Sequence, residues 1–406
     1  MCKGISFAAS LTLTVLMSMA AGAQPFCEES FIFDPEVESH GHVHASCIVE
    51  CPNGDLRAVW YENATPLPPP YYSERKDKSD DVRIGGARKP KGADTWEKPF
   101  VMADSFGVSD NNPCMVIDAQ DRLWLIRPTL LGVPGWTWGS ALVRYSISSD
   151  YQKPGVPSWN VQEILVPHPT GLEDVLKKTA ETVGARGDFP QEMIDTYMKR
   201  ALKQLEEPLA PRLGWMPRAH PLVRSDGTLI LPLSNENFNI AVMAMTNDGG
   251  QTWTLSSPVP EAGVTQPTLV EFADGTISAF FRNSGREHRI KRSDSKDGGV
   301  TWSELTTTDL LHPGAGIEAT LLRNGHLLMI YNDKEESPRD RLAVSISTDR
   351  GATWQWTRHL ENIPGGRFDY PSIVQAKDGT IHATYSYNLK TIKHAHFNEA
   401  WVQEGE

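Results

Sequence analysis

Beyond its first residues, the sequence contains no hydrophobic stretch that approaches the ~20 apolar residues of a membrane span. Cationic residues are also scarce, because 39 Lys and Arg stand against 51 Asp and Glu and leave a formal net charge of -12. A nucleic-acid surface is therefore not expected as the main function. The acidity does not exclude an anionic sugar as ligand, since a local arginine pocket can outweigh the overall field.

Cysteine is scarce as well, with 5 residues in the chain of 406, and no Cys or His spacing matches a zinc site. No acidic loop has the ligand spacing of an EF-hand. The sequence therefore predicts no metal and no cofactor. Cys47 and Cys51 lie on one expected strand, too far apart along it for an easy disulfide, so buried thiols are slightly favoured.

The first 23 residues have the pattern of a signal peptide. Lys3 supplies a positive start, the stretch 5–19 is apolar, and Ala21-Gly22-Ala23 supplies an A-x-A cleavage site. The sequence therefore predicts export to the periplasm or the extracellular space, with a mature chain over residues 24–406.

A short turn motif recurs six times, each copy after an apolar run. Its Asn-Gly or Asp-Gly pair supplies the positive φ angles of a tight hairpin turn, and only the second copy has lost the glycine. The copies are Asn53-Gly54-Asp55-Leu56, Asp121-Arg122-Leu123, Asp226-Gly227-Thr228-Leu229, Asp274-Gly275-Thr276-Ile277, Asn324-Gly325-His326-Leu327 and Asp378-Gly379-Thr380-Ile381.

A second motif, S/T-x-D-x-G-x-T-W, occupies residues 246–253, 295–302 and 347–354, and degenerate versions end at Trp96 and Trp159. Its Asp and Ser or Thr side chains can tie a turn through local backbone hydrogen bonds. The Trp ring then fills the gap beneath the turn. We interpret these boxes as folding staples and not as catalytic motifs.

The last complete units repeat every ~50 residues, which is the size of a propeller blade. A single blade cannot bury its own faces, so the six turns predict an all-β, six-bladed β-propeller. The segment 392–401 is expected to pair with N-terminal sequence and complete the ring. The strand-poor segment 171–208 is expected to form a helical insertion between blades two and three, and padding on the outer edge is favoured over a lid.

The starts of the innermost strands can be aligned by counting back from each repeated turn. Polar and ionisable groups gather at the same end in all six, and converging polar groups in a concavity are the default ligand site. The starts are His42-Val43-His44, Asn111-Asn112-Pro113, Met216-Pro217-Arg218-Ala219-His220, Thr265-Gln266-Pro267, Ala315-Gly316-Ile317-Glu318 and Phe368-Asp369-Tyr370-Pro371.

The three complete boxes, with an Asp-Gly-x-Ile turn between them, resemble the Asp-boxes (BNR repeats) of sialidases, also called neuraminidases. The similarity covers most of the mature chain, which most resembles bacterial proteins described as predicted neuraminidases. It implies a glycoside hydrolase of exo-α-sialidase type that acts on terminal acidic sugars of a glycan. Sialidases grip the sialate carboxylate with three arginines and use a tyrosine nucleophile, a glutamate that activates it, and an aspartate as acid and base.

Carried over position by position, the resemblance makes Tyr370 the nucleophile, because it lies in Phe-Asp-Tyr-Pro-Ser-Ile-Val before the sixth turn. Arg282 matches the second arginine. Gln266 stands where the activating glutamate is expected, and a glutamine cannot accept a proton. Glu318, one blade further on, is the candidate substitute carboxylate.

The other two arginines of the family are missing. His42 and His44 occupy the first-blade strand, and the third position falls near Ser345. Arg218 and Arg367 lie at strand starts and are the candidates for a different cluster. A standard sialic-acid pocket therefore does not follow from the sequence.

The candidates for the acid and base lie in a charged first-blade loop, where Asp80 and Asp81 are nearest and Asp77 stands behind them. The residues expected to bind substrate come from the aligned strand starts and from the arginine match. They are His44, Asn112, Arg218, His220, Arg282, Arg367 and Asp369.

Two other functions stay open. In a polysaccharide lyase on the same propeller, His44 or His220 would remove the C5 proton of a uronate and Tyr370 would act as the acid. In a non-catalytic carbohydrate-binding propeller, aromatic rings would stack on sugar faces. The candidates for such stacking are Tyr71, Tyr72, Trp136, Trp138 and Trp215.

Overall fold

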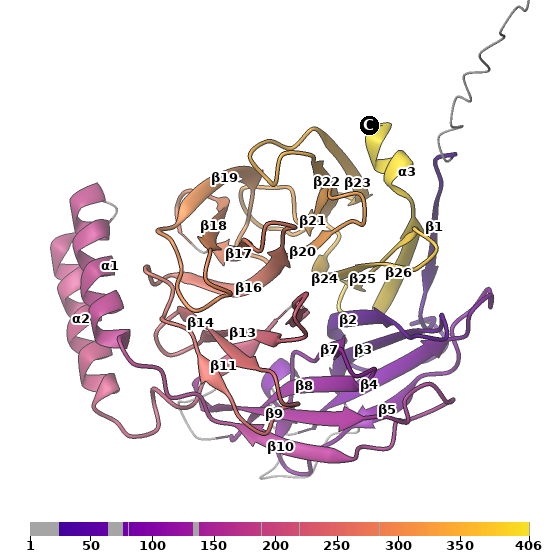
Figure 1. Cartoon of the computed structure of the whole chain (residues 1–406), viewed down its shortest axis with the longest axis horizontal. Helices are drawn as coiled ribbons and strands as arrows, with labels where there is room; N and C mark the ends of the chain where they lie inside the picture. Colours follow the sequence, from indigo (N-terminus) through magenta and orange to yellow (C-terminus); the bar gives the residue numbers. More distant parts are fainter. Residues whose placement is uncertain are drawn as a thin grey trace, which may run out of the picture.

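The structure is a computed structural model of the whole chain, and it describes residues 24–63, 76–79, 81–132, 138–187, 189–218, 220–283 and 285–405. Within these residues the strands form six antiparallel sheets arranged as blades around a central axis (Figure 1). The predicted all-β, six-bladed propeller is confirmed. The expected leader, residues 1–23, lies outside the described residues.

Blades one to three are formed by strands within residues 44–255. In blades two and three the inner strand is divided into two short pieces, which both pair with the next strand. Blade one holds β2 (His44–Glu50), β3 (Leu56–Asn63), β4 (Val82–Lys89) and β5 (Phe100–Ala103); blade two holds β6 (Ser109–Asp110), β7 (Cys114–Ile117), β8 (Leu123–Leu130), β9 (Ala141–Ser148) and β10 (Val161–Leu165); blade three holds β11 (Trp215–Pro217), β12 (Leu222–Val223), β13 (Leu229–Asn235), β14 (Ile240–Thr246) and β15 (Thr254–Leu255).

Blades four to six follow in order, and the last is completed by a strand from the beginning of the chain. Blade four holds β16 (Val264–Glu271), β17 (Ile277–Asn283), β18 (Arg289–Ser295) and β19 (Thr306–Leu311); blade five holds β20 (Glu318–Leu321), β21 (Leu327–Tyr331), β22 (Arg341–Ser347) and β23 (Trp356–Asn362); blade six holds β24 (Phe368–Gln375), β25 (Ile381–Tyr387), β26 (Thr391–Phe397) and β1 (Cys27–Phe31). Cys27 is opposite Phe397 in the antiparallel β1–β26 pair, which confirms the predicted closure.

The repeated turns join the first two full-length strands of each blade. The turn glycines have positive φ, as the Asn-Gly and Asp-Gly pairs predict, and Asp121 at φ 56° takes this conformation where the glycine is lost. Neighbouring blades cover both faces of the middle strands, and β8, β13 and β14 are buried along their whole length.

The boxes tie turns as predicted. Asp297 accepts hydrogen bonds from the Thr301 hydroxyl, the Thr301 backbone N–H (2.9 Å) and the Ser295 hydroxyl (2.8 Å). These donors lower the pKa of Asp297 to about 2. Trp302 is buried beneath the turn. The equivalent carboxylates, Asp248 and Asp349, have the same threonine donors.

The insertion between blades two and three consists of α1 (Leu172–Arg186) and α2 (Gln191–Leu205). It packs on the outer edge of the propeller (Figure 1), as the sequence favoured, with Leu172, Leu176 and Ala201 in the core shared with these blades. The insertion also contacts the segment that leads into blade four, because Thr179 Oγ1 accepts a hydrogen bond of 2.8 Å from Ala262 N in that segment.

The helices of the described residues also include η1 (Lys76–Lys78), η2 (Trp138–Ser140) and α3 (Glu399–Gln403). None of the helices in this part of the chain is long and apolar enough to cross a membrane. Cys27, Cys47, Cys51 and Cys114 are free thiols, in agreement with the slight preference for thiols over disulfides.

Candidate active site

The inner strands of four blades carry a residue with positive φ at equivalent positions, near the start of the strand. These residues are Ala45 (φ 53°), Asn112 (φ 32°), Gln266 (φ 51°) and Tyr370 (φ 49°). In β2, β16 and β24 the pairing register shifts at this point. Such bulges re-aim side chains, and left-handed backbone at a non-glycine residue is concentrated at functional sites. The four strands therefore present a common ring of positions at one end of the central channel.

Tyr370 lies at the centre of a polar contact set at this end. Arg282 Nη1 donates a hydrogen bond to Tyr370 Oη at 2.9 Å, and Gln266 Nε2 donates to the same oxygen at 3.2 Å. Arg282 Nη1 also faces Gln266 Oε1 at 3.3 Å. A hydrogen bond donated by a cation stabilises negative charge that develops on the accepting oxygen. The structure thus brings together three residues that the sequence placed in one site.

More cations surround the phenol ring. The guanidinium carbon of Arg218 lies 5.2 Å from the centre of the Tyr370 ring, and that of Arg339 lies 6.0 Å from it. Arg339, in the loop before β22, was not predicted from the sequence, in which the third arginine position of the family falls near Ser345. Ser345 is buried within β22 and shares a hydrogen bond with the Tyr331 hydroxyl at 3.1 Å.

Asp369 holds two of the arginines. Its carboxylate accepts hydrogen bonds from Arg339 Nη1 at 2.7 Å and from Arg367 Nε at 2.5 Å. Burial raises the pKa of Asp369, but the positive charges of Arg339 and Arg367 and the hydrogen bond from Arg339 act against burial, and the pKa is lowered. Asp369 therefore remains a carboxylate that orients arginines, and it is a poor direct partner for an anionic substrate.

His44 packs against the nucleophile candidate, with the ring centres of His44 and Tyr370 4.5 Å apart. Its Nδ1 shares a hydrogen bond with Ser386 Oγ at 2.9 Å. Burial lowers the pKa of His44 to about 3, so the imidazole is neutral at physiological pH. A neutral imidazole can accept a proton, but a pKa this low makes His44 a weak base at neutral pH.

The first-blade loop presents a different carboxylate from the expected one. Asp81 is buried, and its Oδ1 accepts hydrogen bonds from Ser79 Oγ and from Asn63 Nδ2, the latter at 3.1 Å. Asp77 is less buried, and its charge raises the pKa of Tyr61, after the larger effect of burial. Asp77 is therefore the better acid and base candidate. Asp80 lies outside the described residues.

Asn112 and its neighbour Asn111 belong to the same mouth. Asn111 Nδ2 donates a hydrogen bond to the backbone oxygen of Asp77 at 2.8 Å, which fixes the loop beside blade two. Asn112 occupies the bulge position and is 6% exposed. The structure thus places Asn112 at the ring of positions shared with Gln266 and Tyr370.

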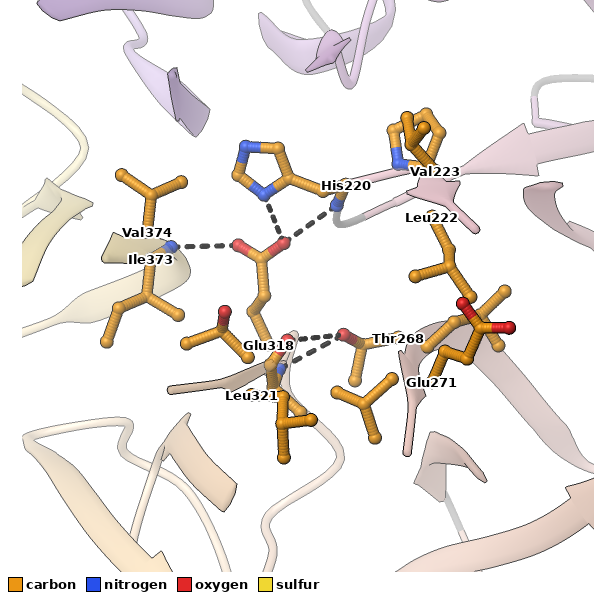
Figure 2. A pocket seen from close by; sticks show the side chains of 14 residues that line it. His220, Leu222, Val223, Thr268, Glu271, Glu318, Leu321, Ile373 and Val374 are labelled. Atoms are coloured by element: carbon orange, nitrogen blue, oxygen red, sulfur yellow. Dashed lines mark hydrogen bonds and ion pairs between the residues drawn. The ribbon is translucent and has the colours of Figure 1, made fainter. Parts of the chain in front are cut away.

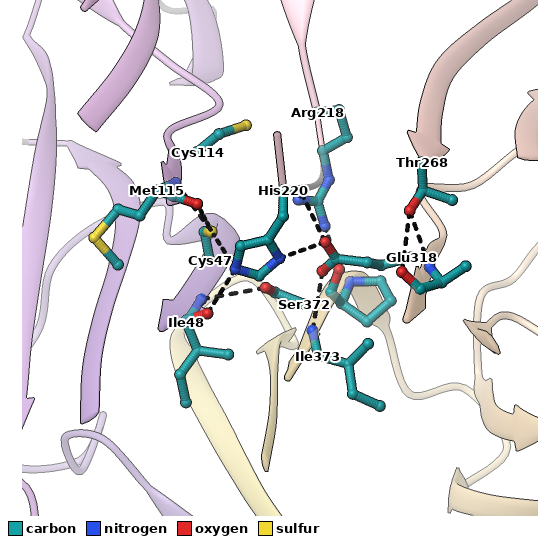
Figure 3. A network of polar contacts seen from close by, with 12 residues as sticks. Cys47, Ile48, Cys114, Met115, Arg218, His220, Thr268, Glu318, Ser372 and Ile373 are labelled. Atoms are coloured by element: carbon teal, nitrogen blue, oxygen red, sulfur yellow. Dashed lines mark hydrogen bonds and ion pairs between the residues drawn. The ribbon is translucent and has the colours of Figure 1, made fainter. Parts of the chain in front are cut away.

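Glu318 and His220 form a separate network in the channel (Figures 2 and 3). Glu318 Oε1 accepts hydrogen bonds from His220 Nδ1 at 2.5 Å and from His220 N at 2.7 Å, and Oε2 accepts one from Ile373 N at 2.9 Å. His220 Nε2 donates to Ile48 O at 2.7 Å. Both ring nitrogens face acceptors, so the pair consists of an imidazolium and a carboxylate, and its contacts link four blades.

The pKa shifts agree with this ion pair. Burial lowers the pKa of His220, but Cys47 and the Glu318 carboxylate raise it well above the ordinary value. Burial raises the pKa of Glu318, but the charge and hydrogen bonds of His220 hold it below the ordinary value. The pair borders a cavity of about 360 Å³ (Figure 2). This engagement does not support Glu318 as the base for Tyr370, nor His220 as a free base.

Arg218 is also occupied by the framework. It is 1% exposed, and its Nη atoms donate to Pro371 O and to Ser46 O, the latter at 3.4 Å. The expected role in binding a carboxylate is therefore not supported. Arg218 instead lies beside the Tyr370 ring and fixes the β2 and β24 backbones.

Comparisons with known proteins show what the chain is similar to. Residues 201–383 match the family model of the BNR repeat-like domain. A sialidase from Paraclostridium sordellii is 28% identical over 338 residues, which cover 76% of this chain and 74% of that protein. A sialidase from Bacteroides fragilis is 22% identical over 339 residues, which cover 78% of this chain and 56% of that protein.

Solved structures show the same fold. The NanB sialidase from Streptococcus pneumoniae superimposes with a TM-score of 0.66 at 12% identity, over 92% of this chain and 71% of that one. The chain is a sialidase-like BNR-repeat β-propeller. It is distantly homologous to bacterial sialidases, although it spans only 26% of the Micromonospora viridifaciens sialidase that it also matches. A protein of unknown function from Dyadobacter fermentans has a similar structure, with a TM-score of 0.65 at 16% identity over 91% of this chain and 98% of that one.

This sialidase-like propeller contains one more carboxylate that the sequence analysis missed. Glu236 follows β13 and is partly buried. Burial raises its pKa, although the charges of Arg282 and Lys78 act in the opposite direction. Glu236 therefore lies within electrostatic range of the arginine that contacts Tyr370. A raised carboxyl pKa beside an arginine in a cleft is typical of acid and base groups.

Two of the aromatic residues predicted to stack on sugars, Trp138 and Trp215, have other contacts in the sialidase-like propeller. Trp215 is fully buried, and its Nε1 donates to Pro211 O at 3.0 Å, so it cannot stack on a sugar. Trp138 lies under Lys78, whose Nζ is 5.1 Å from the ring centre. Tyr71, Tyr72 and Trp136 lie outside the described residues. No three His, Cys, Asp or Glu side chains converge as a metal site within the described part of the chain.

Proposed function

We propose that the protein is an exo-acting glycoside hydrolase of sialidase type, with Tyr370 as nucleophile and a terminal acidic sugar as substrate. The observation that carries the proposal is the hydrogen bond of 2.9 Å from Arg282 to Tyr370 Oη within a cluster of arginines. Homology to sialidases supports the same chemistry. Export of the mature chain belongs to this proposal, because a leader-like N-terminus suits an enzyme that acts on external glycans.

The substrate carboxylate would be bound by Arg282 and Arg339. Both guanidinium groups lie near Tyr370, and Asp369 holds Arg339 in place. Planar guanidinium groups match carboxylate geometry. In this scheme Arg339, which lies before β22, supplies one of the two arginines that are missing from the aligned positions of the family pattern.

In the reaction, a bond forms between Tyr370 Oη and the anomeric carbon while the bond to the leaving oxygen breaks. Asp77 is proposed to protonate the leaving oxygen and then to deprotonate a water, whose oxygen bonds to the anomeric carbon while the bond to Tyr370 Oη breaks. Gln266 cannot take the phenol proton. Glu236, whose pKa is raised, is proposed to accept it directly or through water.

The test uses Tyr370→Phe and a fluorogenic sialoside. We expect the variant to lose turnover by on the order of 10³-fold or more, because the nucleophile is removed while the ring packing against His44 is kept. The measurement is kcat/KM from the fluorescence increase with purified protein.

Tyr331→Phe is the matched control. It removes a buried phenol hydroxyl that contacts Ser345 in blade five, away from the bulge positions, and should leave kcat/KM unchanged. If Tyr370→Phe had the same turnover as the wild type and the same thermal unfolding midpoint, the assignment of Tyr370 as nucleophile would be contradicted. Glu236→Gln should slow turnover by about 10²-fold or more if it is the base.

One observation favours a second candidate function, a uronate lyase. The neutral imidazole of His44 lies against Tyr370, the arrangement that removal of a C5 proton and protonation of the leaving oxygen require. Arg282 or Arg339 would neutralise the uronate carboxylate. Here the C5 proton passes to His44, the bond from C4 to the leaving oxygen breaks, and a C4–C5 double bond forms.

The lyase reading is tested by ultraviolet absorbance on uronate-containing polysaccharides. His44→Gln would reduce the absorbance increase by about 10²-fold or more, because glutamine cannot take the proton. His168→Gln, at an exposed loop residue, is the control. Sialoside turnover without any absorbance increase would exclude the lyase and retain the hydrolase.

A further inference from the structure

A pocket of about 410 Å³ opens beside Arg282, between blade four and the turn that joins α1 to α2. We name it the insertion pocket. A pocket of this volume is within the range that binds a small ligand. The side chains that bear on its chemistry are Arg186 and Phe189 of the insertion, Glu236, and Arg282, Arg286 and Lys291 of blade four.

Two of its cations are neutralised by carboxylates of the pocket itself. Arg186 Nη1 lies 3.2 Å from Glu261 Oε1, and Lys291 pairs with Glu287. Arg282 and Arg286 form no ion pair with any described residue. Glu236 is the one further carboxylate that lines the pocket, and it forms no ion pair with either of them. In a chain with a formal net charge of -12, two guanidinium groups beside one carboxylate are a local excess of positive charge.

The side chain of Arg286 is held in place by a ring contact. Its guanidinium carbon lies 5.0 Å from the centre of the Phe189 ring, a stacking contact that leaves the edge N–H groups available. Phe189 comes from the segment between α1 and α2, so the insertion fixes the place of the cation. The insertion is therefore both padding on the outer edge and part of the wall of a charged pocket.

Arg282 connects the insertion pocket to Tyr370, because the same guanidinium lines the pocket and donates to Tyr370 Oη. We propose that the insertion pocket binds the carboxylate of a second acidic sugar, the one next to the sugar that is cleaved, through Arg286. The preferred substrate is then a glycan with consecutive acidic sugars. Cleavage of the neighbouring sugar rests on the proposed function, but the second carboxylate site does not.

The test is calorimetric binding to full-length Tyr370→Phe protein, which prevents turnover by the proposed route. The probes are α2,8-linked disialic acid against N-acetylneuraminic acid, and digalacturonate against galacturonate. In at least one pair, the dimer should bind about 10-fold more tightly or better, because a guanidinium–carboxylate contact is added. Arg286→Ala should remove that advantage and leave the affinity of the monomer unchanged.

Arg289→Ala is the charge-matched control. Arg289 lies on the same blade but pairs with Glu335 and is not among the residues that line the pocket, so its loss should keep the advantage of the dimer. Equal affinity for dimer and monomer in both pairs, absence of dimer binding, or equal weakening of both by Arg286→Ala would overturn the inference. Because the readout is binding, a protein that hydrolyses no sialoside can still pass this test, which separates it from the proposed function.

Discussion

Glu318→Ala is expected to lower the free energy of unfolding by about 3–5 kcal/mol, because it leaves a buried charge without its partner. Glu318 is 1% exposed and accepts hydrogen bonds from His220 N, His220 Nδ1 and Ile373 N. Truncation leaves these donors without an acceptor in the channel. The measurement is urea-induced unfolding followed by tryptophan fluorescence.

The control and a second variant separate the ion pair from a general loss of packing. Glu335→Ala removes a carboxylate that is 61% exposed and pairs with Arg289, so its effect should stay below about 1 kcal/mol. In the double variant Glu318→Gln/His220→Gln the loss should be smaller than the sum of the single losses, since neither side retains an unpaired charge. Additive losses would show that the two residues are not coupled.

The fold could be predicted from the sequence because the same sequence motifs recur from blade to blade. The Asp-Gly turns and the boxes recur with a fixed spacing, and only a ring of blades buries both faces of strands as apolar as β13 and β14. The insertion was recognised because its helical periodicity interrupts the strand pattern. Its share in a pocket wall was not predictable, since Phe189 meets Arg286 only in three dimensions.

The site was predictable only where it lies on the repeat. Tyr370 and Gln266 sit at the same bulge of two inner strands, so counting back from the turns brought them together correctly. The same count did not show which side chains the bulge turns toward the mouth, and Glu318 was therefore assigned to the site although it bonds within the channel. In blade five the residue at the position equivalent to Tyr370 and Gln266 is Gly316, where an added Cβ would lie 3.0 Å from Tyr370 Cδ1.

Arg339 and Glu236 were missed for a different reason. Both come from segments that join strands, where no periodicity fixes a side-chain direction. Arg339 reaches Tyr370 because Asp369 holds its guanidinium, a contact between blades that no local pattern records. The arginine cluster thus depends on tertiary contacts more than on aligned positions.

The second large effect is expected on acidification, because several histidines are buried in neutral form. Burial lowers the pKa of His44, His312 and His382 to about 3. The two ring nitrogens of His312 have no hydrogen-bond partner among the described residues, and His382 Nδ1 bonds with His394 Nε2 at 2.9 Å. In the unfolded chain each imidazole takes up a proton below about pH 6.5, whereas in the folded chain these three remain neutral down to about pH 3.

The direction in which stability changes with pH follows from this difference in proton binding between the two states. The unfolded state binds more protons between about pH 6.5 and pH 3, so stability falls as the pH falls through this window, by about 1.4 kcal/mol per pH unit for each histidine. Three such groups give about 4 kcal/mol per unit, enough to unfold a domain of ordinary stability well above pH 3. His220 has the opposite shift, so its contribution is fully present below about pH 6.5 and does not add to the acid loss.

Thermal unfolding midpoints between pH 8 and pH 4 test this expectation. The midpoint should change little above pH 7 and fall increasingly steeply below about pH 6. His382→Gln should reduce the slope of stability against pH by the amount that corresponds to about one proton. Glutamine keeps a polar side chain at this position and does not titrate. His168→Gln, at an exposed residue, should leave the slope of wild type. A midpoint that stays constant from pH 7 to pH 4 would mean that these imidazoles are protonated within the folded propeller, and the hydrogen bond between His382 and His394 would then have to be rearranged.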